Sequence, residues 1–106
     1  MADVLTVIAR LKAAPGKEDA MAALLMEQVA IVRDTEPGTL VYRAHRSTRE
    51  PGVFVFYEQY RDAAAFEAHA DAPRLDSFRE RCEREGLTEG PVDDLIEIET
   101  YRSMTE

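Results

Sequence analysis

The sequence contains few of the residues that build disulfides, metal centres or membrane spans. It has one cysteine and two histidines, His45 and His69, and no tryptophan among 106 residues. A single cysteine excludes an intrachain disulfide and a cysteine-rich metal site. No run of about 18 apolar residues occurs, so no membrane-spanning helix is expected. No basic segment precedes the first apolar stretch, so no signal peptide is evident and we expect a cytoplasmic protein.

Positive charge is also scarce. Thirteen lysines and arginines accompany twenty-one aspartates and glutamates, which gives a net charge of −8. Such a chain repels phosphate backbones and anionic lipid surfaces, so the sequence predicts neither a nucleic-acid partner nor a membrane partner. A metal site would need carboxylates such as Glu58 to join the two histidines, so we expect no bound metal.

The apolar and turn residues describe one domain over residues 1–106, with a core at 4–101 and a short C-terminal tail at 102–106. Apolar periodicity distinguishes strands from helices, and glycine and proline mark the turns between them. The predicted strands cover 4–12, 39–48, 53–60 and 92–101, and the predicted helices cover 17–34, 63–71 and 74–85.

This β-α-β-β-α-β order predicts an α+β, ferredoxin-like fold with a four-stranded antiparallel sheet in the strand order 4-1-3-2. The strands at 4–12 and 53–60 are apolar on both faces, as central strands are. The strand at 39–48 alternates, with Tyr42 predicted on one face and Thr39 on the other. Helices can cover only one face of such a sheet. The apolar second face of the third strand therefore predicts a homodimer packed sheet to sheet.

Two predicted elements carry candidate catalytic side chains. His69 borders an apolar helical stripe beside Phe66, where it can act as a general base or be a core histidine bonded to a backbone carbonyl. Glu58 lies inside a central strand, where a carboxylate has either a raised pKa or an ion pair with an arginine. Tyr42 and Tyr60 can donate hydrogen bonds into a cavity or fill the core.

Four short stretches resemble the antibiotic biosynthesis monooxygenase (ABM) family. Residues 15–20, PGKEDA, resemble the beginning of the family's first helix, and residues 36–42, EPGTLVY, resemble its EPGxLxY motif before the second strand. Residues 56–60, FYEQY, followed by residues 62–69, DAAAFEAH, resemble its YExWxDxxAFxxH motif. The motifs keep the family's order and spacing over about residues 4–82.

The resemblance implies a ferredoxin-like subunit that pairs into a dimeric α+β barrel. It also implies a cofactor-independent monooxygenase that oxidises a quinol or polycyclic phenol with dioxygen, without metal, flavin or haem. In this interpretation the catalytic residues are His69, Glu58 and Tyr60. The residues expected to contact the small aromatic substrate are Tyr42, Phe66, Arg74 and Phe78.

Two positions depart from the family pattern. Tyr60 stands where the family usually has tryptophan, and Arg74 stands where it often has a second histidine. Arg74 suits an anionic substrate, so one alternative is isomerisation of a small phosphorylated dicarbonyl sugar derivative, with His69 shuttling a proton. Another alternative is a non-catalytic ligand-binding or stress-response dimer. Thr6 and Tyr60 do not supply the asparagine and tryptophan of the haem-degrading members, so haem degradation is not expected.

Overall fold

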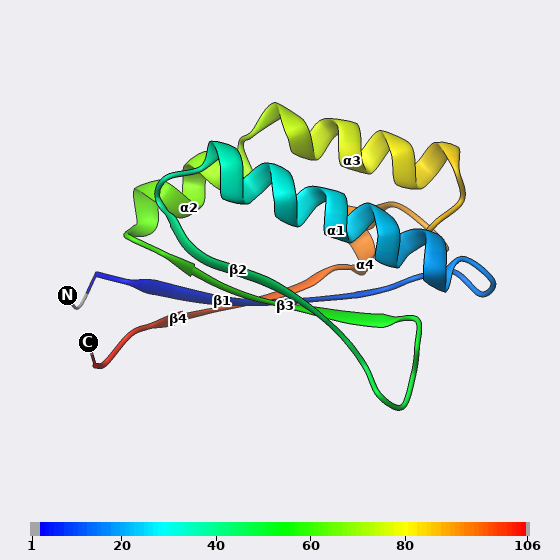
Figure 1. Cartoon of the computed structure of the whole chain (residues 1–106), viewed down its shortest axis with the longest axis horizontal. Helices are drawn as coiled ribbons and strands as arrows, with labels where there is room; N and C mark the ends of the chain where they lie inside the picture. Colours follow the sequence, from blue (N-terminus) through cyan, green and yellow to red (C-terminus); the bar gives the residue numbers. More distant parts are fainter. Residues whose placement is uncertain (1–2, 106) are drawn as a thin grey trace.

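The structure, a computed structural model, describes residues 3–105. It contains the strands β1 (Leu5–Lys12), β2 (Thr39–Arg46), β3 (Val53–Tyr60) and β4 (Glu97–Arg102) and the helices α1 (Glu18–Thr35), α2 (Ala63–Ala70), α3 (Pro73–Arg84) and α4 (Val92–Leu95). The strands form one antiparallel sheet in the order β2-β3-β1-β4. The helices α1, α2 and α3 lie over one face of the sheet (Figure 1). The predicted ferredoxin-like fold and strand order are therefore confirmed. No helix in the described part of the chain is both long and apolar enough to cross a membrane.

The predicted strand at 92–101 is wrong in its first half, because Val92–Leu95 forms α4. The first turn of α4 holds two aspartates, where negative charges suit the helix dipole. Val92 itself is buried in the core, which fixes the turn against the rest of the molecule. The strand β4 then continues through Arg102, the first residue of the predicted tail.

The core lies between the sheet and the helices. Among the helices, α1 contributes the most side chains to it. Six residues of α1 at helical spacing are buried: Met21, Leu24, Leu25, Gln28, Val29 and Val32. The apolar ones among them form one hydrophobic cluster with inward-facing residues of β1, β2 and β3, among them Leu11, Tyr42 and Phe56. Burying each large aliphatic side chain stabilises the fold by about 1.5–3 kcal/mol.

The end of α3 requires a glycine. Gly86 has a φ of 63°, in the left-handed region that glycine adopts without strain. Its amide donates to the carbonyl of Glu83, and the amide of Leu87 donates to the carbonyl of Cys82, which together form a Schellman motif. Leu87 and Cys82 are both buried there. Burial raises the pKa of the Cys82 thiol to about 11, so the thiol stays protonated and unreactive.

A β-bulge in β2 changes which side chains reach the helices. The register shifts between Thr39 and Val41, so that Thr39 lies opposite Tyr60 while Tyr42 lies opposite Glu58. The alternation of the sequence predicts Thr39 on the opposite face from Tyr42. That prediction is wrong, because the extra residue of the bulge brings both side chains to the face covered by helices.

Candidate functional site

A cavity of about 150 Å³ lies between the helix-covered face of the sheet and the helices. Most of its wall is apolar, with Val7 and Phe56 on the sheet side and Phe66 and Phe78 on the helix side. Seven polar side chains interrupt this wall: Gln28, Tyr42, Glu58, His69, Arg74, Arg79 and Asp93. An apolar cavity with a few converging polar groups is the usual form of a small-molecule site.

His69 is the one buried residue of α2, and its ring is held from several sides. The helix is capped at its N-terminus by Asp62, whose carboxylate accepts a hydrogen bond from the amide of Ala65. In the last turn of the helix, His69 places Nδ1 2.7 Å from Oε1 of Glu36. The rings of Tyr42 and Tyr60 each lie 5.3 Å from the imidazole centroid. These contacts fix the orientation of the imidazole at the cavity wall.

The surroundings of His69 favour its neutral form. Burial lowers the pKa of His69 below its ordinary value, and the positive charge of Arg74 lowers it further. The hydrogen bond and the charge of Glu36 act in the opposite direction and only partly offset the burial. A neutral imidazole bonded to a carboxylate carries its proton on Nδ1. Nε2 is then the nitrogen that can accept a proton from a molecule in the cavity.

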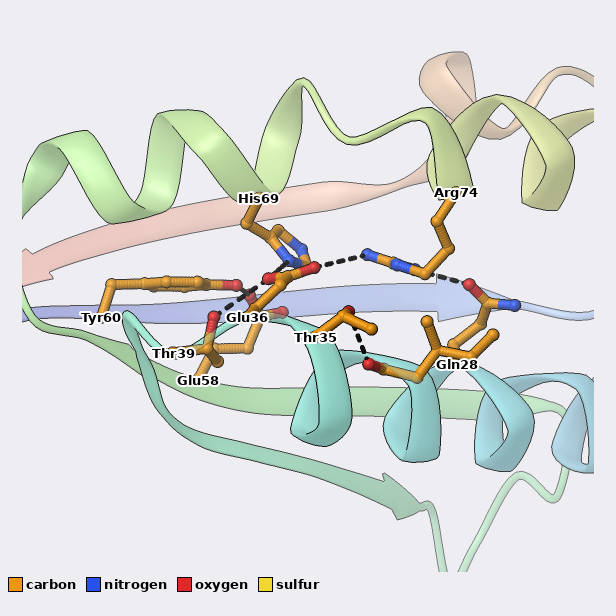
Figure 2. Close-up of polar contacts among 9 residues, drawn as sticks. Gln28, Thr35, Glu36, Thr39, Glu58, Tyr60, His69 and Arg74 are labelled. Atoms are coloured by element: carbon orange, nitrogen blue, oxygen red, sulfur yellow. Dashed lines mark hydrogen bonds and ion pairs between the residues drawn. The ribbon is translucent and has the colours of Figure 1, made fainter.

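Glu36 connects three of the polar side chains. Its Oε1 accepts the hydroxyl of Thr39 at 3.0 Å as well as contacting His69, and its Oε2 lies 3.6 Å from Nη2 of Arg74 (Figure 2). Glu36 is the C-cap of α1, where the helix dipole disfavours a negative charge. The three contacts offset this cost. Glu36 is part of the family motif EPGxLxY, but we did not predict it as a site residue. The signal available in the sequence was an acidic residue at the end of an amphipathic helix.

The turn after Glu36 rests directly on α2. A Cβ atom added to Gly38 would lie 2.7 Å from the Cβ of Ala65, closer than side chains pack. The carbonyl of Gly38 also accepts the amide of Arg61 at 2.9 Å, immediately before α2. Only a glycine allows this approach, which brings His69 within reach of Glu36.

Glu58 and Tyr60 form a second buried polar pair, on the same face of β3. The Tyr60 hydroxyl donates to Oε1 of Glu58 at 2.5 Å. Burial raises the pKa of Glu58 to about 7, although the Tyr60 hydrogen bond lowers it. Burial and the charge of Glu58 raise the pKa of Tyr60 far above its usual range, so Tyr60 remains a donor. Glu58 lines the cavity, whereas Tyr60 is fully buried against Phe66 and reaches the cavity through Glu58.

Arg74 lies in the first turn of α3 and extends toward α1. Its Nη1 donates to Oε1 of Gln28 at 2.5 Å, and its side chain is 11% exposed. Gln28 was also missed as a site residue. The signal was a polar residue within the apolar stripe of α1.

The structure brings most of the predicted site residues together. Six of them line one cavity: Tyr42, Glu58, Phe66, His69, Arg74 and Phe78. His45 lies apart, on the uncovered face of the sheet. Within residues 3–105, no group of three or more histidine, cysteine, aspartate or glutamate side chains is arranged to hold a metal ion.

Three crystal structures are similar to this chain over nearly its whole length. PA3566 from Pseudomonas aeruginosa is 30% identical with a TM-score of 0.82, and the alignment covers 99% of this chain and 98% of that one. SO0527 from Shewanella oneidensis is 25% identical with a TM-score of 0.81, covering 97% and 93%. A Caulobacter crescentus protein, named as a candidate antibiotic biosynthesis monooxygenase, is 25% identical with a TM-score of 0.84, covering 98% and 92%. Comparison with curated protein sequences gives no significant match.

The sequence model of one family matches residues 4–81, from β1 to most of α3. This segment includes Glu58, His69 and Arg74, which line the cavity, and Glu36, which contacts His69 and Arg74. The description of the matching family is antibiotic biosynthesis monooxygenase. The resemblance inferred from the short motifs is thus confirmed, and the chain belongs to the antibiotic biosynthesis monooxygenase family.

Proposed function

We propose that this protein is a cofactor-independent monooxygenase that oxidises a small quinol or a related phenol with dioxygen. The observation that carries the proposal is the buried His69, bonded to Glu36 at 2.7 Å and lining an apolar cavity. Membership of a monooxygenase family supports the reaction class. A neutral histidine against an apolar pocket is the arrangement that deprotonation of a phenol requires.

The first step is proton transfer. Nε2 of His69 accepts the proton of a substrate hydroxyl, and the Glu36 carboxylate stabilises the imidazolium that forms. The resulting phenolate is electron-rich enough to pass an electron to dioxygen. The positive charge of Arg74 lies on the same cavity wall and favours an anionic substrate there.

The oxidation balances without another reductant. A quinol and dioxygen give a hydroxylated quinone and water: the ring supplies four electrons, one oxygen atom enters the ring, and the other leaves as water. Reduced oxygen must be protonated before it leaves. Glu58, whose pKa is about 7, can hold and return a proton in the same cavity.

The size of the cavity favours a substrate with one ring. A cavity of about 150 Å³ in another protein holds a single benzene molecule. A single-ring quinol therefore fits inside, whereas a polycyclic phenol would have to extend beyond the cavity.

The proposal includes a homodimer. The face of the sheet without helices has a shallow groove formed by Ile8, Val41, Val55 and Tyr57 together with Arg43 and His45. A second copy packed sheet to sheet would remove these apolar side chains from water. Light scattering should then give about twice the chain mass of 11.9 kDa. A monomer at micromolar concentration would contradict this part of the proposal.

An oxygen electrode tests the proposed reaction. The purified protein, with a chelator present, should consume oxygen with a panel of single-ring quinols faster than the uncatalysed rate. Product analysis in ¹⁸O₂ should show one labelled oxygen atom in the quinone. No uptake above background across the panel would reject the monooxygenase.

One observation favours a second candidate. The Arg74 guanidinium at the cavity could hold an anionic group, as isomerisation of a phosphorylated dicarbonyl sugar derivative would require. That reaction would exchange a substrate proton with solvent and consume no oxygen. Deuterium incorporation without oxygen uptake would favour the isomerase. Binding with neither effect would favour a non-catalytic ligand-binding dimer.

A further inference from the structure

The guanidinium of Arg74 has more hydrogen-bond donors than acceptors around it. Its Nη1 donates to Gln28, but Nε and Nη2 are buried with no hydrogen-bond partner in the described part of the chain. The nearest carboxylate, that of Glu36, lies 3.6 Å from Nη2, beyond hydrogen-bond length. Leaving charged donors unpaired in the interior is unfavourable, and such groups call for an explanation.

Glu36 is poorly placed to satisfy these donors. Its Oε1 already accepts from Thr39 and contacts His69. Arg74 also lies in the first turn of α3, where the helix dipole disfavours a positive charge. The unpaired donors of Arg74 and its positive charge in the first turn of α3 both lower the stability of the fold. The guanidinium nevertheless forms part of the cavity wall. A ligand acceptor in the cavity would supply the missing partner.

We propose that the substrate is an aromatic acid, whose ring carboxylate binds the Arg74 guanidinium while its ring hydroxyl faces His69. This inference rests on the proposed oxidation of a hydroxylated ring and names the class of that ring. A carboxylate has two oxygens in the spacing that a guanidinium pairs with through two parallel hydrogen bonds. Because Nε and Nη2 are covered by protein atoms, binding of the carboxylate requires the guanidinium to turn toward the cavity.

Charge favours a carboxylate over a phosphate. One guanidinium can balance the single charge of a carboxylate. A phosphate dianion would add a second negative charge near Glu58, which lines the apolar cavity, and near Glu36, which lies beside Arg74. A carboxylate is also smaller than a phosphate, which suits a cavity of about 150 Å³.

Two probes that cannot be oxidised test the inference without turnover. Benzoate and benzamide have nearly the same shape and differ in charge. In titration calorimetry the unmodified protein should bind benzoate at least about tenfold more tightly than benzamide, as a charge-assisted pair implies. The variant Arg74→Gln should bind the two probes within about twofold of each other.

A matched control is available on the next turn of α3. Arg79 also lines the cavity, but it is already paired with Asp76 and with Asp93 at 2.9 Å. Arg79→Gln should keep the preference for benzoate. Should Arg74→Gln fail to fold, Arg74→Lys serves instead, because it keeps the charge but loses the paired geometry and should reduce the preference.

Three results would overturn the inference: equal binding of benzoate and benzamide by the unmodified protein, no measurable binding of either at 10 mM, or tighter binding of phenyl phosphate than of benzoate. Oxygen uptake is measured separately, with 2,5-dihydroxybenzoate and hydroquinone. Selective benzoate binding without uptake would reject the monooxygenase and retain the aromatic-acid site. Uptake with equal kcat/KM for both substrates would retain the monooxygenase and reject the aromatic-acid site.

Discussion

The two faces of the sheet differ most clearly along β3, where alternate side chains of one strand enter two environments. Phe54, Phe56, Glu58 and Tyr60 face the helices, and each is at most 8% exposed. Tyr57, which points the other way, is 38% exposed. The cavity on the covered face is lined by both a carboxyl group with a raised pKa, Glu58, and a histidine with a lowered one, His69. The uncovered face presents an apolar groove instead.

This difference separates two tasks. Where helices complete the burial, a polar group must find a partner or change its pKa, and both responses produce groups suited to proton transfer. Where burial is incomplete, apolar side chains require another surface to cover them. Within the proposal, the covered face performs chemistry and the uncovered face forms the dimer.

The sharpest way to test this division compares the same substitution on each face. His69→Ala should lower kcat by about 10²–10⁴, because a general base typically contributes that factor. His45→Ala, on the uncovered face, should leave kcat unchanged. Oxygen uptake per dimer, measured with the best substrate of the quinol panel, gives both values. Equal losses in the two variants would show that the faces do not divide the work in this way.

The uncovered face should respond most to a charge. In the proposed dimer, Tyr57→Glu would bury an unpaired carboxylate between the two sheets and weaken association by about 3–5 kcal/mol. Concentration-dependent light scattering should then show a monomer. Tyr57→Phe keeps the ring and is the matched control that should remain dimeric. A dimer in both variants would place the interface elsewhere.

The covered face should make folding stability depend on pH through Glu58. Its pKa in the folded protein, about 7, lies above the ordinary value of 4.5, so its contribution is fully present below about pH 4.5. The contribution should fall by up to about 3 kcal/mol as the pH rises through 7. His69, with a lowered pKa, acts with the opposite sign.

The variant Glu58→Gln isolates this effect, because His69 is present in both proteins. Urea unfolding between pH 4.5 and 8 should show the unmodified protein losing stability relative to Glu58→Gln as the pH rises. A difference that stays constant with pH would mean that Glu58 titrates normally.

The smallest effect concerns the contact that aligns the covered site. Gly38→Ala places a methyl group 2.7 Å from Ala65, so we expect a loss of about 1–3 kcal/mol as α2 shifts. Gly90→Ala is the control, since its added Cβ would lie 3.9 Å from the nearest atom, a side-chain carbon of Leu95. Thermal unfolding of the two variants should differ accordingly. Equal stability would show that α2 can move away from β2 without cost.

The sequence predicts the elements well where the pattern is local. The strand at 53–60, which is apolar on both faces, has the predicted bounds. The helical periodicity predicted the bounds of α1 to within one residue at each end. The prediction was wrong at α4 because four residues after a proline are too few to show a period. It was also wrong at Thr39, because one extra residue in a strand reverses its faces without changing the composition.

The sequence by itself determined the fold class, the strand order and six of the residues that line the cavity, because hydrophobic spacing and turn residues act over short distances along the chain. Only the tertiary structure decided the polar connections of the site. Glu36 is 33 residues from His69, and Gln28 is 46 residues from Arg74. Such pairs form only when the turn at Gly38 and the first turn of α3 bring separate elements together. The raised pKa of Glu58 and the lowered pKa of His69 likewise follow from burial, which no stretch of sequence specifies alone.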